Sequence, residues 1–234
     1  MSLVDVIIPA YNPGRYLRDS IESVLSQTYK DFSIIVIDDC STQSIKPIVD
    51  SYDNTVYYRT DRNLGPAGAR NLAIKNSSAE FISLLDADDL MHKDKLRLSI
   101  EELRKDSGVG MTCGNYRVVR NRKDLMRPFY SRPIDINYSM LMRQNFVASG
   151  STTIRRDVFE KVGLFDELYR ISEDYDMWVR IAESFRIKYI HNVLYYYSVI
   201  PSEGSLTNMA DSKATGERNS KLIRAASRKR MENG

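Results

Sequence analysis

Short apolar runs that alternate with helical periodicity constrain the fold of this chain most strongly. The apolar runs are typical of strands and cover residues 4–9, 33–37, 56–60 and 81–85. Between and after them, apolar residues recur at helical spacing in residues 12–27, 66–75 and 93–105. This strand–helix rhythm predicts an α/β fold with a mixed, mostly parallel central sheet flanked by helices. Asn12 before Pro13 fits the N-cap of the first helix.

The second half of the chain is less regular. Strands are expected at 109–116, 187–190 and 193–198, helices at 157–163 and 174–185, and a loop or hairpin at 117–133. A further helix with a basic face is expected from Asn208 onward. Because no linker rich in proline, glycine or serine divides the chain, we expect one domain over residues 1–207 and a C-terminal helical extension over 208–234.

Composition excludes several classes of protein. The 234 residues include 42% hydrophobic and 28% charged residues, which fits a globular protein with a sizeable core. A net charge of +3 is too small for a dedicated nucleic-acid binder. Cys40 and Cys113 cannot form a disulfide framework, and Asp5 and Pro9 interrupt the apolar stretch that a signal peptide needs. No apolar run approaches the roughly 18–20 residues of a membrane span, so a cytoplasmic location is expected.

Polar residues follow four of the predicted strands where each strand ends. They are Tyr11, Asn12, Asp38, Asp39, Asn63, Asp86, Asp88 and Asp89. Because ligands of parallel α/β sheets bind at the carboxyl ends of the strands, these side chains predict a binding rim. Each one alone has a plainer interpretation, since Asp38 and Asp39 suit a polar turn and Tyr11 suits a packing aromatic.

In the motif Leu84-Leu-Asp-Ala-Asp-Asp89, three carboxylates follow an apolar strand. Oxygen ligands of this kind suit Mg²⁺ or Mn²⁺ shared with substrate phosphates, and a turn with solvated acids is the alternative. Asp174 lies in the first turn of a predicted helix, either as a general base or as an ordinary helix start. Trp178, four residues on, is either an acceptor platform or partly core.

Several other chemistries lack their sequence patterns. The chain contains no G-x-G-x-x-G fingerprint, no phosphate loop of the G-x-x-x-x-G-K type, no H-E-x-x-H pair and no paired C-x-x-C. Its two histidines, His92 and His191, make a histidine-rich metal site or a serine–histidine triad a poor explanation.

Taken in order, the motifs resemble glycosyltransferase family 2 over residues 3–206. The matching segments are VIIPAYN at 6–12, IDDCST at 37–42, NLGPAGARN at 63–71, LDADD at 85–89, RRDVFEKVGLFDE at 155–167 and EDYDMWVR at 173–180. Cys40 stands where the family usually has glycine. The resemblance implies the GT-A fold and a nucleotide-sugar donor, UDP-linked by expectation.

The resemblance also implies roles for individual residues. Nucleotide binding would fall to Pro9, Ala10, Tyr11, Asn12, Asp39, Asn63, Arg70 and Asp86. Asp88, helped by Asp86, would ligate Mn²⁺ or Mg²⁺ on the diphosphate, with Asp89 competing for that role. Asp174 would be the catalytic base, and Glu173 and Trp178 would contact the acceptor. Transfer would proceed by one displacement that inverts the anomeric carbon.

One segment departs from the family. Where members often carry an arginine or histidine near the diphosphate, this chain has Ser198 and Ile200. The departure keeps a second hypothesis open, a non-catalytic sugar-nucleotide-binding module. A nucleotidyltransferase is a third hypothesis, and it lacks a basic, glycine-rich phosphate loop after the first strand.

The expected acceptor is a glycan or a lipid-linked glycan in cell-surface polysaccharide synthesis. Residues 211–234 hold seven basic and three acidic residues, a net charge of +4. Such a tail is either a solvated, fraying helix or a contact with anionic lipid through Lys221, Arg224, Arg228 and Arg230. The second interpretation predicts association with the inner face of the membrane.

Overall fold

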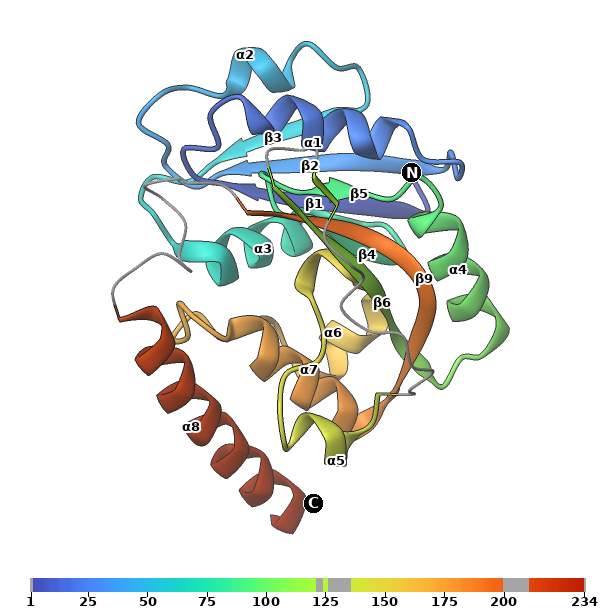
Figure 1. Cartoon of the computed structure of the whole chain (residues 1–234), viewed down its shortest axis with the longest axis vertical. Helices are drawn as coiled ribbons and strands as arrows, with labels where there is room; N and C mark the ends of the chain where they lie inside the picture. Colours follow the sequence, from blue (N-terminus) through green and yellow to red (C-terminus); the bar gives the residue numbers. More distant parts are fainter. Residues whose placement is uncertain (1, 121–123, 126–135, 200–210, 234) are drawn as a thin grey trace.

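A single mixed sheet organises the chain. The computed structural model describes residues 2–120, 124–125, 136–199 and 211–233 (Figure 1). Four parallel strands come first, in the spatial order β3-β2-β1-β4. They are β1 (Val4–Ala10), β2 (Phe32–Asp38), β3 (Thr55–Arg59) and β4 (Phe81–Leu84). The predicted α/β class and parallel first half are therefore confirmed.

The sheet continues past β4 with strands of mixed direction, in the order β8-β6-β9-β5. These strands are β8 (Thr153–Arg155), β6 (Val109–Arg120), β9 (Arg186–Val199) and β5 (Leu90–Met91). The two short strands predicted at 187–198 are one strand, β9, which pairs with β6 through register shifts. β6 extends to Arg120 and pairs antiparallel with β7 (Asp124–Leu125), and the rest of the predicted loop or hairpin lies outside the described residues.

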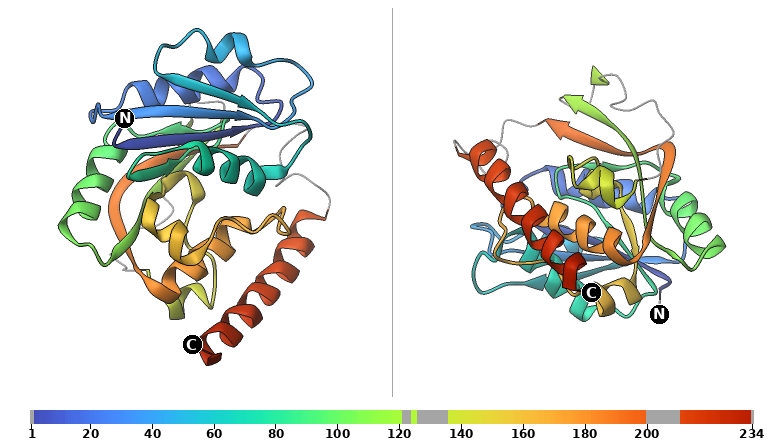
Figure 2. Two further views of the ribbon diagram at one scale, coloured as in Figure 1. Left: turned by 180° about the vertical axis from the view of Figure 1, so that it is seen from behind. Right: turned by 90° about the horizontal axis from the view of Figure 1, so that it is seen from below.

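Helices cover both faces of the sheet (Figures 1 and 2). They are α1 (Tyr16–Leu25), α2 (Lys46–Val49), α3 (Gly65–Asn76), α4 (Lys95–Lys105), α5 (Tyr138–Leu141), α6 (Arg156–Val162), α7 (Glu173–Ser184) and α8 (Ser212–Asn233), with a 3-10 turn η1 (Ser149–Ser151). Alternation along β1 places Val6 and Ile8 in the core with α1 and α4, and Ile7 in the core with α3 and α7. Burial on both faces explains why these strands are apolar throughout.

The predicted cap of the first helix is wrong. α1 begins at Tyr16, and Asn12 instead adopts a left-handed backbone with φ 48°. Its side-chain oxygen accepts hydrogen bonds from the amide (2.8 Å) and hydroxyl (3.0 Å) of Thr42. Asn12 therefore ties the loop after β1 to the loop after β2 and does not start a helix.

The C-terminal helix is docked rather than fraying. α8 lies along α7, and Ile223 is fully buried in the core that α3, α6 and α7 share (Figure 2). Arg230 pairs with Glu183 of α7 at 2.8 Å. Within the described ranges, none of the helices is both long enough and apolar enough to cross a membrane.

Docking of α8 predicts unequal effects of two neighbouring substitutions. Ile223→Ala should lower the free energy of unfolding by about 2–4 kcal/mol, because it removes a buried side chain. Leu222→Ala is the matched control: Leu222 is 49% exposed, so its effect should stay within about 0.5 kcal/mol. Urea denaturation measures both, and equal effects would mean that α8 does not pack on the core.

Candidate active site

The candidate site lies at the carboxyl ends of β1, β2 and β4. Pro9 and Ala10 end β1, and the ring of Tyr11 just beyond them is 45% exposed. Asn12 is exposed beside it. These residues offer a backbone edge and one accessible aromatic face, on which a nucleobase can stack.

The two acids after β2 have separate tasks. Asp38 is buried, and it accepts hydrogen bonds from the Tyr57 hydroxyl (2.7 Å), the Ser41 amide (2.8 Å) and Arg59. Burial alone would raise the pKa of Asp38, but these donors outweigh it and lower the pKa. Asp38 therefore fixes the turn after β2 and is not open to a ligand.

Asp39 holds the start of α3. One carboxylate oxygen accepts from the Leu64 amide (2.8 Å) and the Thr60 hydroxyl (3.0 Å), and the other from the Gly65 amide (2.8 Å). Asn63 donates to the Asp39 carbonyl at 3.4 Å, so these two predicted residues are neighbours. Asp39 is 3% exposed, so its carboxylate is mainly committed to the start of α3.

Cys40 explains why glycine is usual at its position in the family. Its φ is 63°, in the left-handed region that a residue with a side chain adopts only under strain. Its Sγ lies 3.7 Å from the Asp61 carbonyl. The turn after β2 therefore holds a residue with a side chain in a backbone conformation that favours glycine.

The Asp-Ala-Asp-Asp run after β4 divides into outward and inward carboxylates. Asp86 and Asp88 are both partly exposed, and Asp86 accepts a hydrogen bond from Arg70 at 2.9 Å. Burial, together with the neighbouring Asp86 charge, raises the pKa of Asp88 to about 6. Asp86 and Asp88 thus form a negatively charged pair facing the rim.

Asp89 faces the interior. It is 1% exposed, and it accepts hydrogen bonds from the Ser198 amide (2.6 Å) and the Tyr195 hydroxyl. Both carboxylate oxygens are thereby used to hold the end of β9 against the loop after β4. Asp89 is therefore not a competitor of Asp88 for a metal.

A buried guanidinium joins this rim to the start of α7. Arg70, 3% exposed, donates to Glu173 at 2.6 Å and to Asp86 at 2.9 Å. Burial would lower the pKa of Arg70, but the charges of Asp86 and Glu173 raise it, so the guanidinium stays charged. Arg70 therefore brings together side chains from α3, the loop after β4 and α7.

Asp174 is next to this cluster. Its Oδ1 accepts from the Tyr175 amide at 2.6 Å, and its side chain is partly exposed. Burial and the Glu173 charge raise its pKa to about 7, while Arg70 acts in the opposite direction. A carboxylate with a pKa near neutrality can take a proton and later release it at physiological pH.

The acceptor-contact predictions are wrong for two residues. Trp178 is fully buried, and its ring meets Phe165 edge-on at 6.3 Å between centroids. It cannot form a platform because it is part of the core. Glu173 is 7% exposed and its carboxylate is taken by Arg70, so it positions the cluster instead of meeting an acceptor.

Sequence reasoning missed Lys95. This lysine is fully buried on α4, and its ammonium donates to the carbonyls of Leu84 (2.8 Å) and Gly150 (2.7 Å). Burial lowers its pKa, which Asp86 opposes. Lys95 thus fixes the end of β4 just before Asp86. Its spacing could have indicated that Lys95 is buried, because Lys95, Ser99 and Leu103 follow one another at four-residue intervals on the buried face of α4.

The donor set fits a divalent cation shared with a substrate. No group of three His, Cys, Asp or Glu side chains arranged for a metal occurs in the part of the chain that the structure describes. Asp86 and Asp88 supply two carboxylates, and Mg²⁺ or Mn²⁺ sites often complete such a pair with phosphate oxygens and water. The mutual repulsion expressed in the pKa of Asp88 is what a cation would relieve.

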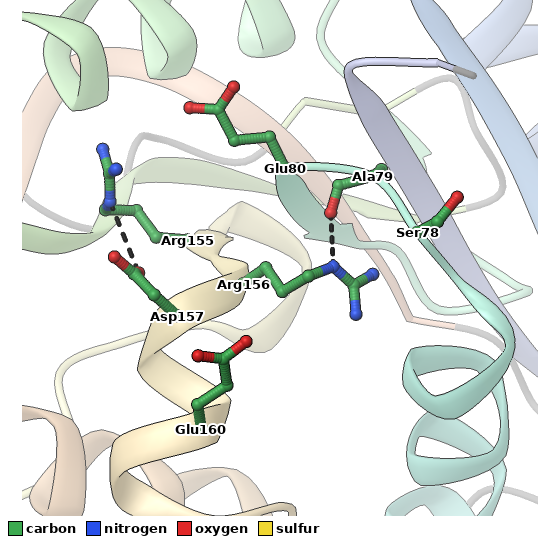
Figure 3. A pocket seen from close by; sticks show the side chains of 7 residues that line it. All are labelled: Ser78, Ala79, Glu80, Arg155, Arg156, Asp157 and Glu160. Carbon is green, nitrogen blue, oxygen red and sulfur yellow. Dashed lines mark hydrogen bonds and ion pairs between the residues drawn. The ribbon is translucent and has the colours of Figure 1, made fainter.

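A separate hollow of about 270 Å³ lies at the opposite edge of the sheet (Figure 3). It is lined by Ser78, Ala79, Glu80, Arg155, Arg156, Asp157 and Glu160. Arg156 donates to the Ala79 carbonyl at 2.5 Å, and Arg155 pairs with Asp157 at 3.4 Å. The hollow lies at the amino end of β4 and is therefore remote from the carboxylate rim. Its two arginines, Arg155 and Arg156, already have protein partners.

Comparison with known proteins identifies the class and then the family. Among solved structures, TarS of S. aureus in complex with UDP-GlcNAc covers 95% of this chain and 66% of its own, with a TM-score of 0.75 and 20% identity. The mannosyltransferase PcManGT from Pyrobaculum calidifontis, in complex with GDP-Man and Mn²⁺, covers 86% and 58%, with a TM-score of 0.66 and 20% identity. The fold is therefore GT-A, that of nucleotide-sugar glycosyltransferases.

The family is also shown by sequence. The model described as glycosyl transferase family 2 matches residues 5–163, so the chain belongs to that family. An uncharacterized glycosyltransferase of Rickettsia typhi, RT0329, is 33% identical over 199 residues, which are 82% of this chain. This chain spans only 62% of the length of that relative.

A relative with a named reaction is the Escherichia coli WfgD, a UDP-Glc:alpha-D-GlcNAc-diphosphoundecaprenol beta-1,3-glucosyltransferase. It is 29% identical over 191 residues, covering 81% of this chain and 73% of WfgD.

Proposed function

We propose that the chain is an inverting glycosyltransferase that moves a sugar from a UDP-linked donor to a hydroxyl of a glycan or lipid-linked acceptor. The observation that carries the proposal is the position of Asp174 in the first turn of α7, next to Glu173, which Arg70 joins to Asp86 of the rim. The raised pKa of Asp174 is consistent with a base. WfgD, which by its name uses UDP-Glc and a diphosphoundecaprenol-linked acceptor, supports the substrate classes and a role in cell-surface polysaccharide synthesis.

The donor would bind along the rim. Tyr11 would stack on the base, and Pro9, Ala10 and Asn12 would line the base and ribose. Asp39 would accept from the base N–H. Asn63 would shape the pocket through its contact with Asp39. Asp86 would reach the ribose or the water shell of the ion.

The diphosphate end would meet Asp88 and Asp86. Mn²⁺ or Mg²⁺ held there would neutralise charge on the departing nucleoside diphosphate. Arg70 would orient Asp86 and adds a fixed positive charge to the same region. Ser198, which stands where relatives often carry a cation, is buried and its amide is bound to Asp89, while Ile200 lies outside the described residues.

Asp174 would act on the acceptor. Its carboxylate would take the proton of the acceptor hydroxyl as that oxygen attacks the anomeric carbon from the face opposite the diphosphate. The carbon–oxygen bond to the acceptor forms while the bond to the diphosphate breaks, so one displacement inverts the configuration. The proton remains on Asp174 until the product leaves.

A donor screen with two variants tests this function. We expect nucleotide release from a UDP-sugar with Mn²⁺ and an undecaprenyl-diphosphate-linked acceptor. Asp174→Asn should lower turnover by about 10²–10⁴-fold and leave UDP binding intact, because it removes only the base. Asp88→Ala should abolish metal-dependent UDP binding in calorimetry.

Asp53→Asn is the matched control, since Asp53 is exposed and precedes β3, at the amino ends of the parallel strands and not at the carboxyl ends that form the rim. If the chain binds nucleotide but shows no turnover above background, so that Asp174→Asn has no effect, the alternative of a non-catalytic sugar-nucleotide-binding module would be favoured. Absence of any metal-dependent nucleotide binding would overturn both.

We also propose peripheral contact with anionic lipid on the cytoplasmic face of the membrane, through the outer side of α8. Exposed basic residues there are Lys213, Arg218, Lys221, Arg228 and Lys229, against the exposed acids Glu217 and Glu232. Exposed Leu222 lies among them. Two of the four residues predicted for this contact already have protein partners: Arg224 donates to the Arg143 carbonyl at 3.3 Å, and Arg230 pairs with Glu183.

Flotation with phosphatidylglycerol vesicles tests the lipid contact. Replacing Lys221, Arg228 and Lys229 by glutamine should weaken binding on the order of 100-fold, at about 1 kcal/mol for each charge. The control replaces Lys30, Lys75 and Lys105, exposed lysines on other elements, and removes the same net charge. Equal flotation of the two triple variants would contradict the proposal.

A further inference from the structure

The segment just before the proposed base has a strained backbone. Ser172, the residue before α7, has φ 73° and ψ 19°, and its side chain makes no capping hydrogen bond. Its carbonyl accepts the first helical bond, from the Asp176 amide at 3.1 Å. A left-handed serine persists only where its surroundings hold it, so the direction in which Asp174 leaves the helix depends on what surrounds Ile171 and Ser172.

One side of this segment is held by the polar cluster. Glu173, the first residue of α7, accepts from the buried Arg70 at 2.6 Å. That bond fixes the residue next to Asp174 against α3. It does not touch Ile171 or Ser172, where the chain turns.

The other side is held by α8, which is about 40 residues further along the chain. The side-chain amide of Asn219 donates to the Ile171 carbonyl at 2.7 Å. One turn earlier, α8 passes so close that a methyl group on Gly216 would lie 3.7 Å from Ile171 and 3.8 Å from the Ser172 hydroxyl. The first part of α8 therefore covers the left-handed turn directly.

The second part of α8 anchors the helix elsewhere. Ile223 is buried in the core, and the Ser227 hydroxyl donates to Glu183 (2.5 Å) and accepts from the Tyr138 hydroxyl (3.1 Å). Glu183 is at the far end of α7 from Asp174. The first part of α8 thus contacts the turn that precedes Asp174, and its second part packs on the core, α5 and α7.

We propose that Asn219 is a positioning residue for Asp174, acting through the Ile171 carbonyl and the left-handed Ser172. The proposal rests on the proposed role of Asp174 as the base. In this proposal, α8 helps to orient the residue that acts on the acceptor. Loss of the Asn219 amide would let the turn relax and move the carboxylate relative to the acceptor hydroxyl, which reactions of this kind tolerate poorly.

Steady-state kinetics of the full chain test the proposal. Asn219→Ala should lower kcat on the order of tenfold, with the KM for the UDP-sugar and the affinity for UDP unchanged, because the donor rim is untouched. Asn219→Gln, which keeps an amide donor, should recover part of kcat. Ser227→Ala is the matched control: it removes a hydrogen bond of the same helix away from the base, and should lower the thermal midpoint comparably while leaving kcat unchanged.

The outcomes separate this proposal from the proposed function. An unchanged kcat in Asn219→Ala, or equal losses of kcat in Asn219→Ala and Ser227→Ala, would overturn the positioning role. If Asp174→Asn retains full turnover in the same assay, the proposed base itself fails, whatever Asn219 does.

Discussion

The pairing of one buried arginine with two carboxylates is the constraint on which the rest of the site depends. Arg70 reaches Asp86, close by in sequence, and Glu173, more than a hundred residues away. A guanidinium at 3% exposure is stabilised by the charges of its two partners, because an uncompensated buried charge is strongly destabilising. The donor rim and the start of α7 are therefore fixed relative to each other by a single side chain.

Hydrogen bonds to buried groups also determine which of the acids after β4 face the rim. Asp89 points inward, and both of its carboxylate oxygens accept hydrogen bonds from β9. Lys95 donates a hydrogen bond to the carbonyl of Leu84. With the chain held on both sides, Asp86 and Asp88 are presented toward the rim without partners enough to neutralise them. A divalent cation bound between them would relieve their mutual repulsion and would leave coordination positions for a diphosphate.

The strands, their carboxyl ends and the family could be predicted from the sequence, because they depend on patterns of residues that are close together in the chain. Apolar runs followed by acids located the strands and their carboxyl ends, and the clustered motifs pointed to the correct family. The roles of Trp178 and Asp89 could not be predicted, since an aromatic or an acid on a short motif gives no sign of which way it faces. That direction is decided by packing partners far away in sequence, Phe165 for Trp178 and Tyr195 for Asp89. The docking of α8 was missed for the same reason, because its inward face is mostly polar and pairs with residues such as Glu183 and Ile171.

The central claim is that Asp174 is a base whose proton affinity is set by burial, by Glu173 and, in the opposite sense, by Arg70, with Asp86 as the remaining nearby charge. The most direct measurement is the pH dependence of kcat/KM at saturating Mn²⁺. Because only the ionised carboxylate accepts a proton, the rate should fall with unit slope below pH about 7 and level off above it. Glu173→Gln removes the neighbouring negative charge and should move that midpoint to lower pH. A rate that stays flat from pH 6 to 8, within about a factor of two, would contradict the account.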